Sequence, residues 1–413
     1  MWLEFLRDWI EDLKSYRTRT ALTLLAVSWG TIAVVLLLAF GEGLGDQFVN
    51  GLRNEGDRII VVSGGVTGMR YKGLPGGRRI RLTEEDLVLI KRGIPEVELA
   101  SPQYRRKVVL GNGRIQIATE CEGVNPGVED MKRMYPMSGG RFINEVDVVE
   151  RRHVMFLGSG IAKDIFGGED PLGKTIALDG TPFTVVGLMQ KKIETSIEYG
   201  LQSRRAVIPH STFRVIYGSR YPESLVIRPR DASDQQLIKE QIYRILGNEH
   251  HFDSRDLRAL GVSDFIEAEK NAKTVALGLS IFLGTLGALT LVVAGVGVAN
   301  IMFIIVKERT REIGIRIAVG AKRGHILAQF TFEAFLLAIV GGGIGFLISW
   351  IIVAVVRFLP MEGGIMQFLG RPRLSLEVIV TSISILASIV LAAGFFPAWR
   401  AAAVDPVESL RYE

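Results

Sequence analysis

The sequence predicts a membrane protein with four transmembrane α-helices and a large α+β extracytoplasmic domain inserted between helices 1 and 2. Two observations predict this class. Apolar residues make up 48% of the chain and are concentrated in four long blocks, whereas the rest, rich in Arg, Glu, Asp and Gly, has the composition of a soluble domain. A chain of 413 residues that was soluble throughout would spread its apolar residues over two or three domains.

The four blocks divide the chain into nine segments. In order, we expect an amphipathic interfacial helix at 1–19, transmembrane helix 1 at 20–40, the extracytoplasmic domain at 41–262, a stalk and transmembrane helix 2 at 263–306, a cytoplasmic segment at 307–325, transmembrane helix 3 at 326–356, a short external loop at 357–377, transmembrane helix 4 at 378–396 and a cytoplasmic tail at 397–413.

The first two spans differ in length. Residues 21–40 carry no charge, and 20 helical residues reach about 30 Å, the thickness of a bilayer core. The apolar region of a signal peptide is shorter, so we expect a true span. Residues 275–306 carry no charge over 32 positions, about 48 Å of helix. This helix should therefore protrude from the membrane as a stalk, or kink near Gly295 and Gly297.

The third and fourth spans contain two special features. The third contains Glu333 and a glycine-rich run at 341–345, and the fourth ends at Pro397. A carboxylate inside a span is costly unless it is paired or reaches the headgroups. Glu333 could therefore link to a basic residue of 307–325 or to another helix, or it could lie at headgroup level and reach water.

Basic residues near the span ends set the orientation, because Lys and Arg accumulate on the cytoplasmic side. They lie before the first span (Arg7, Lys14, Arg17, Arg19), between the second and third (Lys307, Arg309, Arg311, Arg316, Lys322, Arg323) and after the fourth (Arg400, Arg411), with fewer between the third and fourth (Arg357, Arg371, Arg373). Both termini and residues 307–325 are therefore predicted to be cytoplasmic, and residues 41–270 to lie outside.

The first residues form one apolar helical face. Its members, spaced 4, 3, 4 and 3 apart, are Trp2, Leu6, Trp9, Leu13 and Tyr16. We interpret this segment as an interfacial helix with its tryptophans at headgroup depth; packing on a partner or on the bundle is the alternative.

Residues 41–262 mix strand and helix signals, as an α+β domain does. Strands are expected at 58–62 and 105–110, and Gly111–Asn112–Gly113 is a hairpin turn signal. Thr83 followed by three acids predicts a helix that ends at Gly93, and 235–246 is a second helix candidate.

Residues 168–175 match the phosphate-binding pattern GxxxxGK[ST] letter for letter. That loop must follow a buried strand and open a helix, so that helix amides face the phosphates. Here a helix-like segment precedes it, a strand-like segment follows it, and Pro171 removes a backbone N–H. We therefore predict a turn rather than a nucleotide site.

No other pattern indicates catalysis, a metal site or a bound cofactor. The five histidines are scattered, and the single cysteine, Cys121, excludes an intrachain disulfide. The net charge of +5 suits nucleic acid or an anionic membrane surface, and the spans favour the membrane. We expect a non-enzymatic chain with lipid contacts and no nucleic-acid partner.

Four features resemble the MacB/FtsX-type family of ABC transporter permeases, and together they cover nearly the whole chain. They are the stretch 308–316 with Ala318, Gly320 and Ala321; the carboxyl end at 397–402 with Asp405, Pro406, Leu410 and Arg411; the ectodomain pieces at 140–142, 157–158, 170–174 and 185–187; and the pattern of one span, a large ectodomain and three spans. The first two features are specific to this superfamily, and the third favours MacB-like members, with a MacB-like periplasmic core domain and an FtsX-like membrane domain, over lipoprotein-release or division-type ones.

The resemblance implies a homodimer or close heterodimer that carries a separate ABC ATPase, which would bind the ATP, and we expect no ATPase fused before the interfacial helix. An adaptor or membrane-fusion protein is a possible further partner. Such permeases transmit motion through stalk helices to a porter-like ectodomain, here with an inserted subdomain near 121–204. The implied ATPase-coupling residues are Glu308, Arg309, Arg311, Glu312, Gly314, Arg316, Gly320 and Ala321.

Three functions fit this resemblance. The leading hypothesis is export of a substrate from the outer face of the cell inner membrane by mechanotransmission. The alternatives are a mechanical signal transmitter that regulates an extracytoplasmic enzyme and a lipoprotein-releasing permease.

Overall fold

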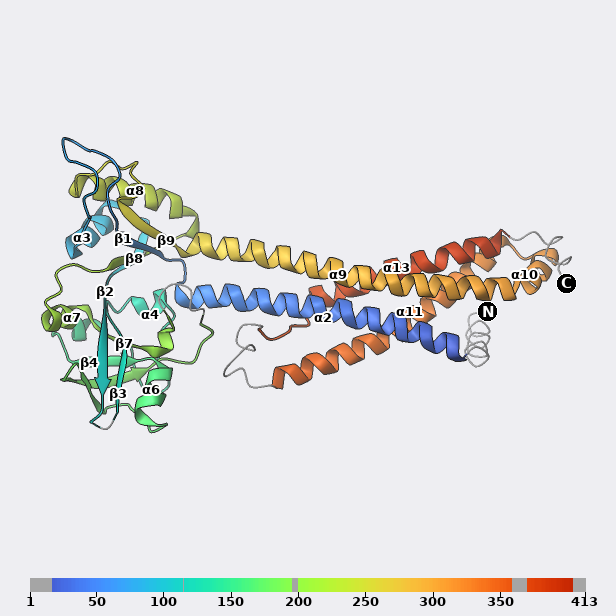
Figure 1. The fold of residues 1–413 in the computed structure, drawn as a ribbon, viewed down its shortest axis with the longest axis horizontal. Coiled ribbons are helices and arrows are strands. Elements are labelled where there is room, and N and C mark those ends of the chain that lie inside the picture. Colours follow the sequence, from blue (N-terminus) through green and yellow to red (C-terminus); the bar gives the residue numbers. More distant parts are fainter. Residues whose placement is uncertain (1–16, 114, 195–199, 359–369, 404–413) are drawn as a thin grey trace. The chain divides into compact units, whose positions relative to one another are not determined.

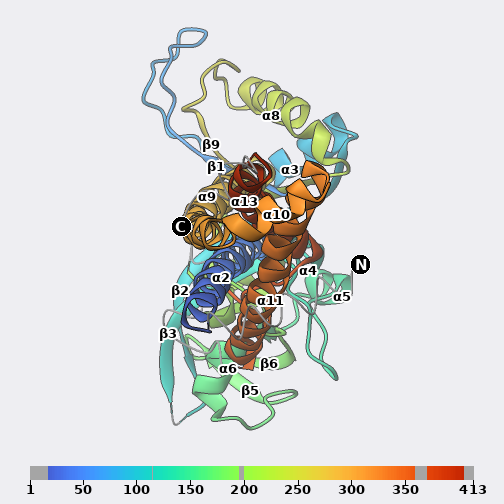
Figure 2. The same cartoon turned by 90° about the vertical axis from the view of Figure 1, so that its right-hand side faces the viewer.

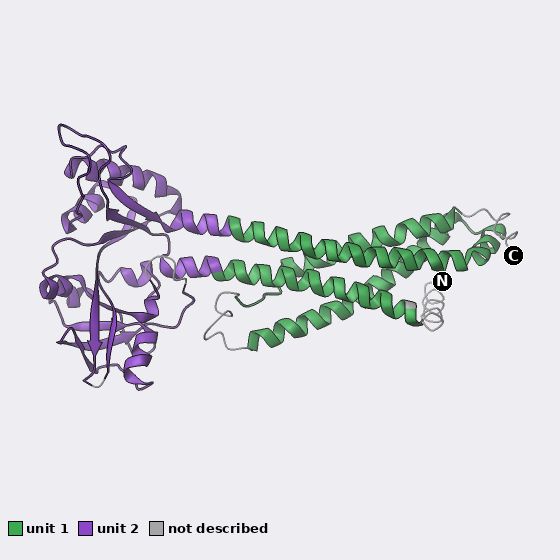
Figure 3. Ribbon diagram, in the orientation of Figure 1, with its two compact units in different colours: residues 1–47, 274–413 green, residues 48–273 purple. Residues whose placement is uncertain are grey.

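The structure, a computed structural model, describes residues 17–113, 115–194, 200–358 and 370–403 (Figure 1). The apolar face predicted for residues 1–16 and the motif residues from Asp405 to Arg411 lie outside this described part. The chain forms two compact units, residues 1–47 with 274–413 and residues 48–273 (Figure 3).

Four helices of the described chain are long and apolar enough to cross a membrane, as predicted. They are α2 (Arg17–Glu55), α9 (Phe265–Glu308), α11 (Arg323–Phe358) and α13 (Leu376–Ala402), and the short α10 (Thr310–Ala318) lies between α9 and α11. α9 is one helix of 44 residues, uninterrupted at Gly295 and Gly297. Each helix extends beyond the uncharged block from which it was predicted.

The glycine run of α11 lets this helix approach α2 closely. The Ser28 hydroxyl donates a hydrogen bond of 2.8 Å to the Gly341 carbonyl. A Cβ added to Gly345 would lie 2.7 Å from the Ser28 carbonyl oxygen, which is too close for any other residue. Small residues at such contacts are typical of helix pairs within membranes, where packing replaces hydrophobic association.

The start of α13 is fastened to α2. Arg373 pairs with Asp46 at 2.9 Å, and the Ser375 hydroxyl donates to Glu42 at 2.6 Å. Ser375 is also the N-cap of α13, since its oxygen accepts from the Val378 amide. The segment before the fourth span is therefore held by side chains of the first.

Unit 48–273 contains the strands and the shorter helices. Its strands are β1 (Ile60–Gly64), β2 (Val97–Gly111), β3 (Gln116–Val124), β4 (Val154–Leu157), β5 (Thr175–Leu178), β6 (Thr181–Leu188), β7 (Arg205–Pro209), β8 (Ser224–Pro229) and β9 (Leu260–Asp264). Its helices are α3 (Glu84–Gly93), α4 (Val128–Met131), α5 (Glu145–Val149), α6 (Ser159–Phe166), α7 (His210–Tyr217) and α8 (Gln235–Glu249).

Several local predictions for this unit are confirmed. Thr83 caps α3 in a capping box with Asp86, and α3 ends at Gly93. The predicted turn joins β2 to β3, which pair antiparallel from Gly111 with Gln116 onward (Figure 2). The candidate helix at 235–246 is the first part of α8.

The strands form two sheets that share β2. The first half of β2 belongs to an antiparallel sheet in the order β9-β1-β8-β2, with α3 and α8 packed on it, a ferredoxin-like arrangement. The second half begins a closed ring that runs β2-β3-β7-β4-β6-β5 and returns to β2. This barrel is built from residues 104–223, a stretch that contains the 121–204 region in which an inserted subdomain is expected.

Candidate functional site

The first candidate site is the segment between α9 and α11. α9 ends at Glu308, and Thr310 begins α10 with its hydroxyl bonded to the Val306 carbonyl at 3.0 Å. α10 ends in a tight turn in which the amides of Gly320 and Ala321 bond back to the carbonyls of Ile317 and Arg316. Gly320 has φ +103°, a backbone conformation that side chains disfavour, so this position requires glycine.

α10 has one buried face and one exposed face. Ile313 is 4% exposed and packs with Ile326 and Phe330 of α11. On the other face, Ile315 is 46% and Val319 85% exposed. Two large apolar side chains on the surface of a short, charged helix indicate a contact with another molecule.

A polar network joins α10 to the first turns of α11. Arg309 lies 3.8 Å from the Glu333 carboxylate, the Arg316 guanidinium donates to the Gln329 carbonyl at 2.9 Å, and the Gln329 amide donates to Glu333 at 3.4 Å. Gln329 and Glu333 are each 9% exposed. Of the alternatives that the sequence left open for Glu333, the structure therefore shows the link to a basic residue of 307–325.

The sequence-predicted site residues fall into three groups. Arg309 and Arg316 belong to the network with Glu333. Gly314 is buried, and Ala321 is half-buried. The remaining members, Glu308, Arg311, Glu312 and Gly320, are exposed, as is Arg316. Sequence reasoning did not single out Gln329, although it lies four residues before Glu333 and so on the same helix face.

Glu333→Gln is expected to leave the fold intact and to raise several-fold the hydrogen exchange of residues 310–321. The amide keeps the contact with Gln329 but removes the charge that faces Arg309, so α10 would be held less firmly to α11. Hydrogen exchange of the purified chain in nanodiscs, followed by mass spectrometry, measures this change. Glu377→Gln, at an exposed position of α13, is the control, and wild-type exchange of residues 310–321 in Glu333→Gln would show that this ion pair does not hold α10 to α11.

The second candidate site is a cluster of buried charges inside unit 48–273. The Glu122 side chain has no solvent exposure and lies 2.6 Å from Arg205, 3.4 Å from Arg105 and 3.4 Å from Lys132. Burial alone would raise the pKa of Glu122, but the three cations outweigh it and lower the pKa to about 2. Glu122 is therefore ionised in the folded protein.

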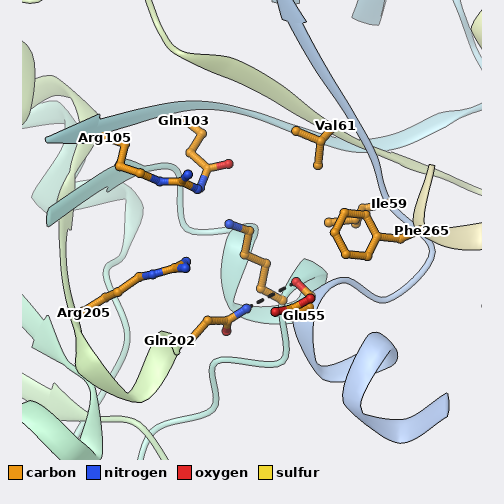
Figure 4. A pocket seen from close by; sticks show the side chains of 9 residues that line it. Glu55, Ile59, Val61, Gln103, Arg105, Gln202, Arg205 and Phe265 are labelled. Carbon is orange, nitrogen blue, oxygen red and sulfur yellow. Dashed lines mark hydrogen bonds between the residues drawn. The ribbon is translucent and has the colours of Figure 1, made fainter. Parts of the chain in front are cut away.

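Next to this cluster lies a small hollow, shown in Figure 4. Arg105 and Gln103 of β2 and Arg205 of β7 point into it (Figure 4). The Gln202 amide donates to the Glu55 carbonyl at the end of α2. The residues that line the hollow are Glu55, Ile59, Val61, Gln103, Arg105, Lys132, Gln202, Arg205 and Phe265. The hollow therefore lies where the end of α2 meets the barrel.

Lys192 joins the same end of α2 to the stretch 104–223 that forms the barrel. Its ammonium donates to the backbone carbonyls of Asn54 at 2.7 Å, Lys132 at 2.6 Å and Arg133 at 3.2 Å, and to the Gln202 side chain at 2.8 Å. Burial, the largest effect, lowers the pKa of Lys192 to about 7, although the nearby Glu194 and Glu55 carboxylates favour the charged form.

The depressed pKa predicts that stability rises with pH. Between pH 7 and 10.5 the unfolded chain holds a proton on Lys192 that the folded chain releases, so raising the pH favours folding. Lys192→Met should remove this contribution, so wild type should gain stability relative to it from pH 7 to 9. Thermal melts of the purified full-length chain by circular dichroism test this, with exposed Lys163→Met as the control. Parallel pH profiles of wild type and Lys192→Met would contradict the prediction.

The apparent phosphate-binding loop at 168–175 is a turn, as predicted. α6 precedes it, β5 follows it, and Gly168 and Gly173 have positive φ. Lys174 pairs with Glu169 of the same loop at 2.6 Å. A helix N-terminus that could face phosphates does not follow it.

Comparison with known proteins gives matches over both units. Residues 20–245 match the family described as MacB-like periplasmic core domain, and residues 284–406 the family described as FtsX-like permease C-terminal. The pyoverdine export ATP-binding/permease protein PvdT of Pseudomonas aeruginosa is 33% identical over 95% of this chain and 56% of its own length. The macrolide export ATP-binding/permease protein MacB of Bdellovibrio bacteriovorus is 30% identical over 100% of this chain and 62% of its own.

The chain thus spans 56% and 62% of the length of these two curated relatives. The matched regions place the four apolar helices in the inner membrane and the α/β unit outside the cytoplasm. The chain belongs to the MacB/FtsX-type family of ABC transporter permeases.

Proposed function

We propose that this chain is the non-catalytic permease subunit that couples ATP hydrolysis on a separate ATPase to a conformational change outside the cytoplasm, and thereby to substrate export. The observation that carries the proposal is α9. It is a single helix from Phe265 to Glu308, about 66 Å of continuous hydrogen-bonded backbone, and its residues belong to both units. A rigid element of this length can transmit a displacement from one end to the other.

The outer end of α9 is fastened within unit 48–273. Glu269 of α9 pairs with Arg53 of α2 at 2.7 Å. Lys239 of α8 pairs with Asp264 at 2.9 Å and with Glu267 at 3.4 Å. Because α8 packs on the ferredoxin-like sheet, a movement of α9 would reach that sheet through these ion pairs.

The inner end of α9 continues into α10, the proposed contact with the ATPase on the cytoplasmic side. Ile315 and Val319 would enter a groove of the ATPase, with Arg311 and Glu312 at its rim. Gly320 would allow close approach there. The Arg309–Glu333 and Arg316–Gln329 contacts would pass the movement of α10 to α11 as well as to α9.

Assembly and substrate follow from the family. We propose two permease copies, as a homodimer or with a homologous chain, on a pair of ATPase subunits, with an adaptor protein as a further partner. The two relatives are named for exporting different compounds, pyoverdine and macrolides, so no one substrate carries over. Regulation of an extracytoplasmic enzyme and release of lipoproteins would use the same transmission.

Breaking α9 tests the proposal. Insertion of Gly-Ser-Gly after Lys273 should leave membrane insertion, ATPase binding and ATP hydrolysis unchanged. It should abolish the ATP-dependent change in hydrogen exchange of residues 48–273. The same insertion between Asp179 and Gly180, in the turn that joins β5 and β6, is the control and should keep the response. A wild-type response after the Lys273 insertion would exclude transmission through α9.

A further inference from the structure

A strongly basic β-ribbon projects from unit 48–273 between β1 and α3. We call residues 65–81 the basic ribbon. In Figures 1 and 2 it is the blue loop that extends past the ends of β1 and β9. It contains no Asp or Glu and five basic residues: Arg70, Lys72, Arg78, Arg79 and Arg81. A surface that carries only positive charges attracts a partner of negative charge.

The ribbon is a preformed structure. Tyr71 and Leu74 exchange backbone hydrogen bonds of 3.1 and 2.9 Å across a two-residue turn. The turn residues Lys72 and Gly73 both have positive φ, as tight hairpin turns require. Nearer the base, the Thr67 amide donates to the Arg78 carbonyl at 2.9 Å, and the Thr67 hydroxyl oxygen accepts from the Arg78 amide at 3.0 Å; Thr67 is 2% exposed.

A buried aspartate anchors the base of the ribbon. Asp256, 2% exposed, accepts hydrogen bonds from the amides of Gly68 at 2.7 Å and Met69 at 2.9 Å. Its other oxygen accepts from the Arg258 amide at 3.2 Å. Binding therefore would not have to order this loop, which lowers the entropy cost of association.

Apolar side chains are exposed beside these charges. Val66 is 45% and Met69 47% exposed. Leu257, 71% exposed, lies next to Arg258, whose carbonyl accepts the Val66 amide. The exposed apolar groups thus come from two segments that are hydrogen-bonded to each other.

Four of the five charges have no counter-ion within the described chain. Arg70, Lys72, Arg79 and Arg81 are exposed, and no described carboxylate lies within ion-pair distance of them. Lys72 and Arg81 lie over the rings of Tyr71 and Tyr221, and Arg78 donates to the carbonyls of His250 and His251. The four exposed cations are available to a partner outside the chain.

We propose that the basic ribbon, with Leu257, is the docking site for a second protein that presents an acidic face outside the cytoplasm. Its composition favours a protein over a lipid or polysaccharide surface. It has four Arg to one Lys, together with Met69 and Tyr71, the residue types enriched where proteins meet. This inference goes beyond the export proposal, because it requires only that unit 48–273 lies outside the cytoplasm.

Photo-crosslinking in living cells identifies the protein that binds the basic ribbon. With p-benzoyl-phenylalanine in place of Met69, we expect the full-length chain to crosslink to one protein, identified by mass spectrometry. The same probe in place of Val215, an exposed apolar residue of α7, should not crosslink to it. Crosslinks from Met69 to lipid alone, or to no molecule, would overturn the proposal.

Charge reversal in the purified pair then tests whether binding depends on the arginines of the basic ribbon. The identified protein is titrated against the full-length chain in nanodiscs. Arg70→Glu with Arg79→Glu should weaken binding at least about tenfold, and salt should weaken the wild-type complex. Lys163→Glu with Arg244→Glu, at exposed positions elsewhere in the unit, makes the same change in net charge and should bind as wild type. Reversal of acidic residues on the partner should restore binding to the ribbon variant. Equal affinities of all variants would overturn the proposal.

Discussion

Glu122→Gln is expected to destabilise unit 48–273 by about 3–5 kcal/mol, the usual cost of removing one partner from a buried ion cluster. Glutamine preserves the shape of the side chain, so the loss comes from charge. Arg205, Arg105 and Lys132, all within 3.4 Å of the carboxylate, would be left with less negative charge in a site closed to water. For the same reason, acid should remove this stabilisation from wild type only as the pH falls from about 4.5 towards about 2.

The chain carries its own probe for this prediction. Cys121 is the single cysteine, has no solvent exposure and precedes Glu122. Its reaction with a thiol reagent in increasing urea therefore reports the opening of the barrel. Glu120→Gln is the control, since Glu120 is 29% exposed and lies 3.7 to 4.0 Å from the two arginines. Similar urea midpoints for the two variants would show that burial of the charge does not matter.

Ile315→Asp combined with Val319→Asp is expected to weaken ATPase binding by at least about tenfold. Burying an aliphatic side chain of this size contributes about 1.5–3 kcal/mol, and every 1.4 kcal/mol changes affinity tenfold. Because both side chains are exposed in this chain, at 46% and 85%, the substitutions should leave its own stability nearly unchanged.

The matched control is Val149→Asp combined with Val215→Asp. These residues are 78% and 61% exposed and belong to unit 48–273, so the same chemistry is introduced away from α10. Titration of the purified ATPase against each variant in nanodiscs gives the comparison. Equal affinities of the α10 variant and the control would remove α10 from the ATPase interface.

The sequence predicted the elements that local physics determines. A run of 20 or more uncharged residues in helical conformation must span a bilayer, and Thr83 followed by acids must cap a helix. The closed barrel could not be predicted this way, because closure depends on β2 pairing with both β3 and β5. The Glu122–Arg205 contact joins residues 83 positions apart, and nothing in either local sequence indicates it.

The candidate site between α9 and α11 was predicted in part. The charge excess of 307–325 predicted a cytoplasmic segment, and the intramembrane position of Glu333 left open a link to a basic residue or another helix, or a position at headgroup level. The structure selects Arg309, because α10 folds back onto the first turns of α11. The hydrogen bonds of Lys192 could not be predicted at all, because three of its four acceptors are backbone carbonyls, which are present at every residue.

The way in which β2 enters the barrel has a consequence for how such chains diversify. The Glu223 amide donates to the Gln103 carbonyl at 2.9 Å, and Gln103 pairs with Ser224, so the chain leaves the ferredoxin-like sheet and returns to it at adjacent positions. The whole of 104–223 is therefore a cassette with neighbouring ends, the geometry at which inserted domains are tolerated. A short hairpin loop from Gln103 to Ser224 would preserve the strand order of the host sheet. Recombination at this junction can exchange one cassette for another, so lineages can acquire new outer modules while they inherit the membrane apparatus unchanged.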